Sequence, residues 1–258
     1  NRTRTIVRGS EDLDEATGEG SGSKIRHRFS RQMETYSPPK HNRMINLTNE
    51  DNMELMKRYP DNYFELAIVD PPYGIGDFNS SKSNHKKIDW NDGIPTKKYF
   101  DELYRVSENQ IIWGANYYQN NIKSVGRIVH DKTGGGKKTV PNSLSEGDIA
   151  SHSFGVTIKV FHYVSNGNVI GNKIDWENTM RWHPCQKPIA LYEWLLMNFA
   201  KEGDKILDTH LGSGSIAMAC HNLGFDLVGC ELDKEYYEAA CKRLKQHQAQ
   251  LTIFNTTE

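Results

Sequence analysis

No charge of one sign dominates this sequence, in which 32 Lys and Arg residues balance 33 Asp and Glu residues. A chain with almost no net charge is not steered to nucleic acid or membrane by its overall field, so a contact surface of that kind must be local. Long hydrophobic runs are lacking, and none approaches the roughly 20 residues that cross a bilayer. The start, residues 1–9, is polar and basic and lacks the apolar centre of a secretory signal. These absences favour a cytoplasmic protein without a membrane partner.

Cysteine is scarce, and no Cys-x-x-Cys pair occurs. This pattern favours reduced thiols over disulfides or a zinc site. The histidines show no metal-ligand spacing either, so no metal is expected. The residues concerned are Cys185, Cys220, Cys230 and Cys241, with His130, His152, His162 and His183.

The length of 258 residues suits one large α/β domain with appendages. Residues 1–43 have linker composition and predict a flexible linker or N-terminal extension. Their basic part could touch DNA phosphates, and a solvated linker explains it equally well. The lack of an initiator Met favours truncation, and Met44 could itself be an ancestral start, because the compact pattern begins there. The folded domain is expected over 44–250, with a tail over 251–258.

Strands and helices alternate along the second half of the chain, which indicates a parallel sheet with helices on both faces. Residues 74–92 and 133–138 are rich in Gly, Ser and Lys and predict loops. An antiparallel strand is expected over 154–163. The other expected strands are 44–48, 64–69, 110–113, 126–130, 205–207 and 227–230, and the expected helices are 52–58, 96–106, 189–201, 216–223 and 234–248.

One candidate site follows the apolar run 64–69, where Asp70-Pro71-Pro72-Tyr73 ends a buried strand abruptly. Each proline fixes its own φ and lacks an N–H, so the turn is stiff and leaves carbonyl oxygens free. A stiff pair of acceptors beside a tyrosine ring could hold a flat molecule that carries an NH₂ group. A strand-ending turn capped by an acid is the alternative.

The second candidate site is the βαβ unit over 205–231, with glycines at its first turn and Glu231 at the tip of its second strand. Such a turn lets backbone N–H groups and a helix N-terminus approach a ligand, and the acid suits a ribose diol. Asp208 stands before the glycines, where it would repel a pyrophosphate and could hold an ammonium group. An amino-acid head group therefore fits better than a dinucleotide. Asp51, expected to end a further strand, could accept from an adenine amine.

Four short motifs in a consistent order resemble those of the S-adenosylmethionine-dependent DNA amino-methyltransferases of the permuted β class, which modify adenine N6 or cytosine N4. They are Asp70-Pro71-Pro72-Tyr73, His183-Pro184-Cys185-Gln186-Lys187-Pro188, the turn from Asp208 to Ser215, and Gly229-Cys230-Glu231. The resemblance covers residues 44–248. It implies a doubly wound, Rossmann-like methyltransferase sheet, mostly parallel with an antiparallel edge hairpin.

The resemblance also implies roles for individual residues. Asp70, Pro71, Pro72 and Tyr73 would be catalytic, and S-adenosylmethionine would be the cofactor. The implied cofactor-binding residues are Asp51, Lys187, Asp208, Thr209, Leu211, Gly212, Ser213, Gly214, Ser215 and Glu231. One departure concerns Thr209-His210, because the family often has Pro-Phe after the acid.

Double-stranded DNA is the implied partner, read by a target-recognition insert over about residues 132–181. A bacterial or phage-encoded restriction-modification enzyme is expected, and a homodimer or a companion restriction endonuclease stays open. Asp70 leans toward adenine within the family, where Ser leans toward cytosine. Cys185 resembles the nucleophile of cytosine-C5 methyltransferases, but there the cofactor turn precedes the nucleophile. An inactive DNA- or cofactor-binding relic is the non-enzyme alternative.

Overall fold

The computed structural model describes residues 44–75, 93–118, 120–136, 145–166, 169–170 and 186–255, and it describes residues 166, 169–170 and 251–255 by backbone alone. The expected contributions of residues 1–43, 76–92, 137–144 and 171–185 lie outside the described residues. These include His183, Pro184 and Cys185. All described residues belong to one unit, 36–258.

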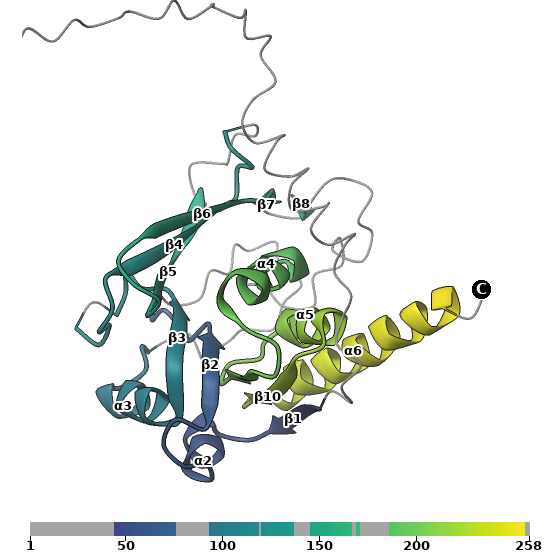
Figure 1. The fold of residues 1–258 in the computed structure, drawn as a ribbon, viewed down its shortest axis with the longest axis horizontal. Helices are drawn as coiled ribbons and strands as arrows, with labels where there is room; N and C mark the ends of the chain where they lie inside the picture. The colour runs from purple at the N-terminus through teal and green to yellow at the C-terminus, as the bar shows by residue number, and fades with distance from the viewer. Residues whose placement is uncertain are drawn as a thin grey trace, which may run out of the picture. The chain divides into compact units, whose positions relative to one another are not determined.

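An eight-stranded mixed sheet organises this unit (Figure 1). Its order is β1-β10-β9-β2-β3-β5-β4-β6. The strands are β1 (Ile45–Asn49), β2 (Phe64–Val69), β3 (Ser107–Trp113), β4 (Gly126–Asp131), β5 (Gly147–His152), β6 (Ile158–His162), β9 (Lys205–Asp208) and β10 (Asp226–Glu231), with a separate two-stranded sheet of β7 (Ser165–Asn166) and β8 (Val169–Ile170). β5 is antiparallel to both β3 and β4, and every other neighbouring pair in the large sheet is parallel. The predicted fold class is confirmed.

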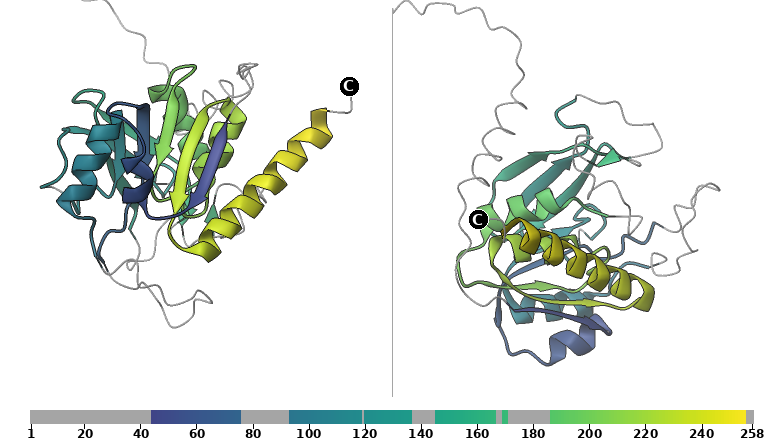
Figure 2. Two further views of the ribbon diagram at one scale, coloured as in Figure 1. Left: turned by 90° about the horizontal axis from the view of Figure 1, so that it is seen from below. Right: turned by 90° about the vertical axis from the view of Figure 1, so that its right-hand side faces the viewer.

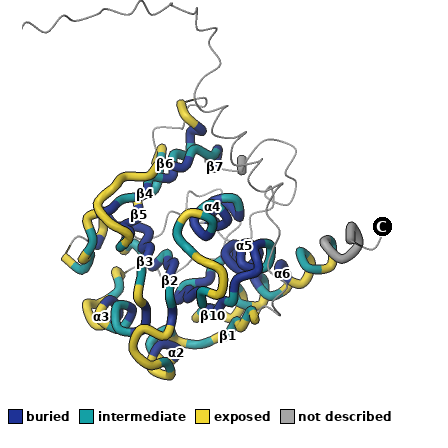
Figure 3. The backbone as a smooth tube through the Cα atoms, in the orientation of Figure 1, coloured by how far each residue is buried: buried dark blue, intermediate teal, exposed yellow. Residues whose placement is uncertain are grey.

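Helices cover both faces of the sheet. α2 (Asn52–Lys57) and α3 (Lys97–Val106) pack together on one face, while α4 (Ile189–Phe199), α5 (Ser215–Leu223) and α6 (Lys234–Asn255) pack on the other (Figures 1 and 2). Successive side chains of a strand point to opposite faces, so a strand covered on both sides is apolar throughout. β2 has this pattern, and Leu66, Ala67 and Ile68 have no exposed surface. Figure 3 shows the resulting dark core along β2 and α5.

Three elements differ from the sequence prediction. The strand expected over 154–163 is the shorter β6, and it runs parallel to β4. β5 was not foreseen, because Gly147-Asp148-Ile149-Ala150-Ser151-His152 contains a single β-branched apolar residue. Both strands fall within 132–181, so this stretch, expected to read DNA, also builds the main sheet. α6 continues to Asn255, beyond the expected end at residue 248.

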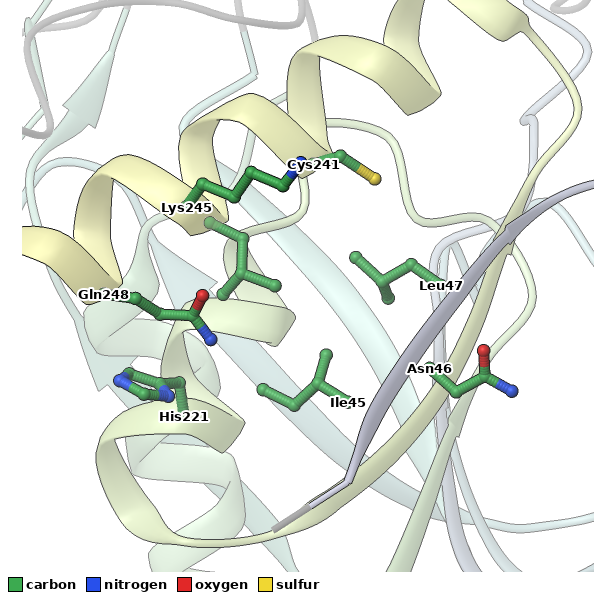
Figure 4. A pocket seen from close by; sticks show the side chains of 8 residues that line it. Ile45, Asn46, Leu47, His221, Cys241, Lys245 and Gln248 are labelled. Carbon is green, nitrogen blue, oxygen red and sulfur yellow. The ribbon is translucent and has the colours of Figure 1, made fainter.

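A surface pocket of about 490 Å³ lies between the edge strand β1 and the helices α5 and α6 (Figure 4). Ile45 and Leu47 form its strand side, and Cys241 and Lys245 lie on its helix side. None of the residues predicted to be functional lines this pocket, so it is separate from the candidate site.

Candidate active site

The two predicted motifs lie at the carboxyl ends of neighbouring parallel strands. β2 and β9 pair directly, with Leu66 opposite Ile206 and Ala67 opposite Leu207. Asp70 follows the last residue of β2, and Asp208 is the last residue of β9. The strand order reverses its direction between these two strands, and α/β sheets bind ligands in the crevice at such a switch point. The fold therefore brings together two sites that are 138 residues apart in the sequence (208 − 70).

Both oxygens of the Asp70 carboxylate have donors. The Tyr73 hydroxyl donates to Oδ1 at 2.6 Å, and Lys187 Nζ donates to Oδ2 at 2.5 Å. Lys187 also donates to the Tyr73 hydroxyl at 3.2 Å. Burial, reinforced by the negative charge of Asp70, raises the pKa of Tyr73 well above its usual range, so this hydroxyl keeps its proton and acts as a donor. Lys187, predicted to bind cofactor, thus lies on the carboxylate of the Asp-Pro-Pro-Tyr motif.

The carbonyl oxygens of the two prolines accept hydrogen bonds from a second tyrosine. The Tyr118 hydroxyl lies 2.6 Å from Pro71 O and 2.5 Å from Pro72 O, and it donates to them as a shared hydrogen bond. A carbonyl oxygen has two lone pairs, so Pro71 O can accept a second donor. Burial raises the pKa of Tyr118 far above its usual range, which again keeps the donor protonated.

The rings near the motif divide into core and surface. Trp113 and Tyr118 are buried in the core. Tyr117 is 41% exposed and stacks on Tyr73, with centroids 4.9 Å apart and planes inclined by 14°. Gly114 makes this packing possible, because an added Cβ would lie 2.4 Å from the Tyr73 ring and the backbone has φ +76°. The Tyr73–Tyr117 pair thus forms an aromatic wall with one exposed ring.

At the second motif, Asp208 is a buried acid. It is 2% exposed, and Oδ1 accepts from the backbone N–H of His210 at 2.9 Å. Burial raises the pKa of Asp208 to about 8, with further contributions from the negative charges of Asp70 and Glu231. The ionised form of this carboxylate lacks a sufficient cation and would be stabilised by one.

The two residues that depart from the family pattern form a polar network. Thr209 Oγ1 lies 2.7 Å from the Tyr99 hydroxyl and 2.9 Å from His210 Nδ1. His210 Nε2 lies 3.1 Å from Asn52 Nδ2, so the imidazole links the turn to the first residue of α2. Burial lowers the pKa of His210 to about 3, and the ring is therefore neutral at physiological pH.

The glycine turn is held by backbone geometry and by two distant side chains. Gly214 has φ +72° just before α5, and a Cβ there would lie 3.0 Å from the Cβ of Ala240. The Gly212 N–H donates to Glu231 Oε2 at 2.8 Å. Arg243 Nη1 donates to Ser213 O at 2.9 Å and to Ser215 Oγ at 3.0 Å. Leu211 packs inside the turn with 4% of its surface exposed.

The expectation that Asp51 ends a strand was wrong. β1 ends at Asn49, and Asp51 is the N-cap of α2, where Oδ1 accepts from the Met53 N–H at 2.8 Å. Asp51 directly precedes Asn52, whose side chain is hydrogen-bonded to His210. The start of α2 therefore places Asp51 near the glycine turn.

Two contributors act through contacts that the sequence does not predict. Tyr118 could be interpreted from the sequence as a base-pocket or a core aromatic, but its contact with Pro71, 47 residues away, was not foreseen. Arg243 contacts Ser213 across 30 residues, and nothing local marks it. Within the described residues, no group of three or more His, Cys, Asp or Glu side chains could hold a metal ion. In the same part of the chain, no helix combines the length and the apolar character that crossing a membrane requires.

Comparison with known proteins agrees with this geometry. A family model described as DNA methylase, of the N6/N4 type, matches residues 157–242. Type II methyltransferase M.HpaI of Haemophilus parainfluenzae is 27% identical over 227 residues, which cover 74% of this chain and 71% of the relative. Type II methyltransferase M2.DpnII of Streptococcus pneumoniae is 26% identical over 249 residues, covering 79% and 90%.

Solved structures share the fold. The M1.HpyAVI–SAM complex superposes with a TM-score of 0.50 at 21% identity, over 78% of this chain and 99% of the other. The cytosine-N4-specific PvuII DNA methyltransferase gives a TM-score of 0.52 at 11% identity, over 80% and 92%. In this chain the Asp-Pro-Pro-Tyr strand precedes the glycine turn, the order expected of the permuted class. The family match falls on the strands and helices that build the glycine turn, and with these relatives it makes the chain similar to the DNA methyltransferases of the N6/N4 type.

Proposed function

We propose that this enzyme transfers the methyl group of S-adenosylmethionine to the N6 amine of an adenine that has been extruded from duplex DNA. The observation that carries the proposal is the side-by-side placement of Asp70 and Asp208 at the ends of β2 and β9. One acid can orient an amine, and the other can hold the donor's ammonium group.

The cofactor half of the proposal uses the buried acid and the glycine turn. Asp208 would pair with the ammonium of the amino-acid group, whose charge stabilises the ionised carboxylate. Gly212 and Gly214 would let the cofactor lie against the turn and the start of α5. Glu231 keeps lone pairs for a ribose diol beside its bond from Gly212. Asp51, Thr209, Leu211, Ser213 and Ser215 complete the proposed lining.

The target half positions one NH₂ group. The lone pair of an exocyclic amine is delocalised into the ring, which makes the amine a poor nucleophile. Hydrogen bonds from the amine to the Asp70 carboxylate and to Pro71 O would draw the lone pair onto nitrogen and aim it at the methyl donor. The amine would replace the Tyr73 hydroxyl at Oδ1, because a hydroxyl is exchanged at lower cost than the buried ammonium at Oδ2.

Displacement at the methyl carbon then needs no covalent intermediate with the protein. S-adenosylmethionine supplies an electrophilic methyl group on a sulfonium. In the proposed step the amine nitrogen would form its bond to the methyl carbon as the bond from that carbon to sulfur breaks. The bonding pair would stay on sulfur, and the nitrogen would release one proton to water. Tyr73 would stack on the extruded base, and base–aromatic stacking is worth about 1–3 kcal/mol.

Cytosine N4 is the second candidate target, since it also presents an amine on a flat ring. Asp at position 70 favours adenine within the family, where Ser favours cytosine. The homodimer, the companion endonuclease, and a cytoplasmic location for a bacterial or phage-encoded enzyme stay predictions alongside this assignment.

The deciding experiment incubates the protein with S-adenosylmethionine labelled in the methyl group and with duplexes of mixed sequence, followed by nucleoside mass spectrometry. Labelled N6-methyladenine is the expected product. N4-methylcytosine would replace the adenine assignment with the second candidate. Absence of label from every nucleoside, with cofactor binding intact, would support the relic alternative.

A further inference from the structure

A buried polar cluster extends from Asp70 to the far half of the sheet. Lys187 bonds to Asp70, and its Nζ also lies 5.1 Å from the centroid of the Trp113 ring at the end of β3. The His130 ring of β4 meets the same Trp113 ring edge-on, with centroids 6.4 Å apart. Asp148 of β5 lies beside His130. The catalytic motif is therefore connected to three strands that carry none of the recognised motifs.

Asp148 is surrounded by cationic or protonatable groups. Its Oδ1 lies 2.7 Å from Lys132 Nζ, and its Oδ2 lies 3.7 Å from His130 Nδ1. The imidazole of His130 is fully buried, and among the described residues neither ring nitrogen makes a hydrogen bond. Burial alone would raise the pKa of Asp148, yet the positive charge of Lys187 and the neighbouring Lys132 and His130 hold it well below its usual range. Asp148 is consequently an anion at every physiological pH.

The charge of Lys187 gives a reason for a second acid, Asp148, near Asp70. The Lys187 side chain is only 6% exposed, so water screens its charge poorly. An ammonium that served Asp70 alone would draw electron density from the carboxylate that must accept the target amine. A second carboxylate, that of Asp148, also attracts the Lys187 ammonium, so Lys187 withdraws less electron density from Asp70. Lys132 balances the negative charge that Asp148 adds.

We propose that Asp148 is a positioning residue for methyl transfer, which acts through Lys187 to set the orientation and the charge of the Asp70 carboxylate. This inference rests on the proposed function, because it assigns Asp148 a part in the same reaction. It places Lys187 with the target half of the site and predicts little effect of either residue on cofactor binding. In this role Asp148 acts without contacting the base or the cofactor directly.

The first test compares single variants under saturating cofactor and DNA. Asp148→Asn is expected to lower kcat about tenfold while the Kd for S-adenosylmethionine changes less than about twofold, a loss that corresponds to about 1.4 kcal/mol. Asp148→Glu should recover most of the rate, since it restores the charge. Glu146→Gln is the matched control, because Glu146 lies two residues earlier and is exposed. It should behave as the unaltered enzyme does.

The second test asks whether Asp148 acts through Lys187. Lys187→Met is expected to reduce kcat more than Asp148→Asn does, and adding Asp148→Asn to Lys187→Met should cost less than about twofold more. An equal tenfold cost in both backgrounds would overturn the inference, as would an Asp148→Asn enzyme with unchanged kcat. A drop in cofactor affinity that matched the drop in kcat would contradict it too. Failure of the proposed function looks different, because the unaltered enzyme would then transfer no methyl group.

Discussion

The two halves of the proposed site differ in the hydrogen-bond partners of their acids. At the target half, Asp70 accepts from Tyr73 and Lys187, and the proline carbonyls accept from Tyr118. At the cofactor half, Asp208 is equally enclosed but has one backbone N–H as its described donor and a pKa raised to about 8 by burial. A substrate amine at the target half must displace an existing hydrogen-bond donor of Asp70. At the cofactor half, a bound cation would stabilise the ionised carboxylate of Asp208.

This difference assigns a different energetic role to each half. In the proposed function, a ligand ammonium at Asp208 would relieve a cost that folding imposed, so cofactor binding would gain from burial. An amine at Asp70 would replace a hydrogen bond with a similar one, so the target half would contribute more to alignment than to affinity. Substitutions in the two halves should therefore separate rate from binding.

The largest expected effect is on the rate, from Asp70→Ala. Without the carboxylate, the amine has no charged acceptor to localise its lone pair, and kcat should fall by about 10³-fold. The Kd for S-adenosylmethionine, measured by calorimetry, should change less than about threefold. Asp61→Ala is the control, because Asp61 is exposed and precedes the start of β2, whereas Asp70 follows its end. Equal losses of rate and cofactor affinity would break the proposed division of the site.

The next effect concerns affinity, from Asp208→Asn. Loss of the charged partner should weaken binding of S-adenosylmethionine about 30-fold, as removing a charge-assisted hydrogen bond does. Asp204→Asn, at the other end of β9, should leave the Kd unchanged. The rate at saturating cofactor should fall much less than in Asp70→Ala.

The same acid predicts a pH dependence. Because burial raises the pKa of Asp208 to about 8, the free enzyme carries a proton there at lower pH. An ammonium ligand requires the ionised carboxylate, so binding releases that proton. Affinity should rise by up to tenfold per unit from about pH 6 to about pH 8 in the unaltered enzyme. Titration calorimetry at several pH values should show this slope flattened in Asp208→Asn, and a slope that persists there would exclude Asp208 as its source.

Local patterns predicted the strand ends and the two acids, because an apolar run that stops at Asp70 or Asp208 identifies the edge of a sheet from sequence alone. The partners of those acids depend on the tertiary fold. Lys187 reaches Asp70 across 117 residues, and no local feature separates a cofactor ligand from a carboxylate partner. β5 was missed for a related reason: its strand conformation comes from pairing with β3 and β4 on both sides, which overrides the weak propensity of its own residues. Asp148 was missed along with it.

The smallest effect tests whether the target half is aligned in advance. Tyr118→Phe removes the hydroxyl that the Pro71 and Pro72 carbonyls share, while the ring that packs against Phe100 and Tyr73 is retained. A net hydrogen bond is worth about 1 kcal/mol, so kcat should fall about fivefold, and cofactor affinity should not change. Tyr117→Phe is the matched control, because it alters the adjacent, exposed tyrosine and keeps the stacked ring. A Tyr118→Phe enzyme as fast as the unaltered one would mean that the two prolines hold Pro71 O in place unaided, and alignment of the target amine would then depend on Asp70 and Lys187 alone.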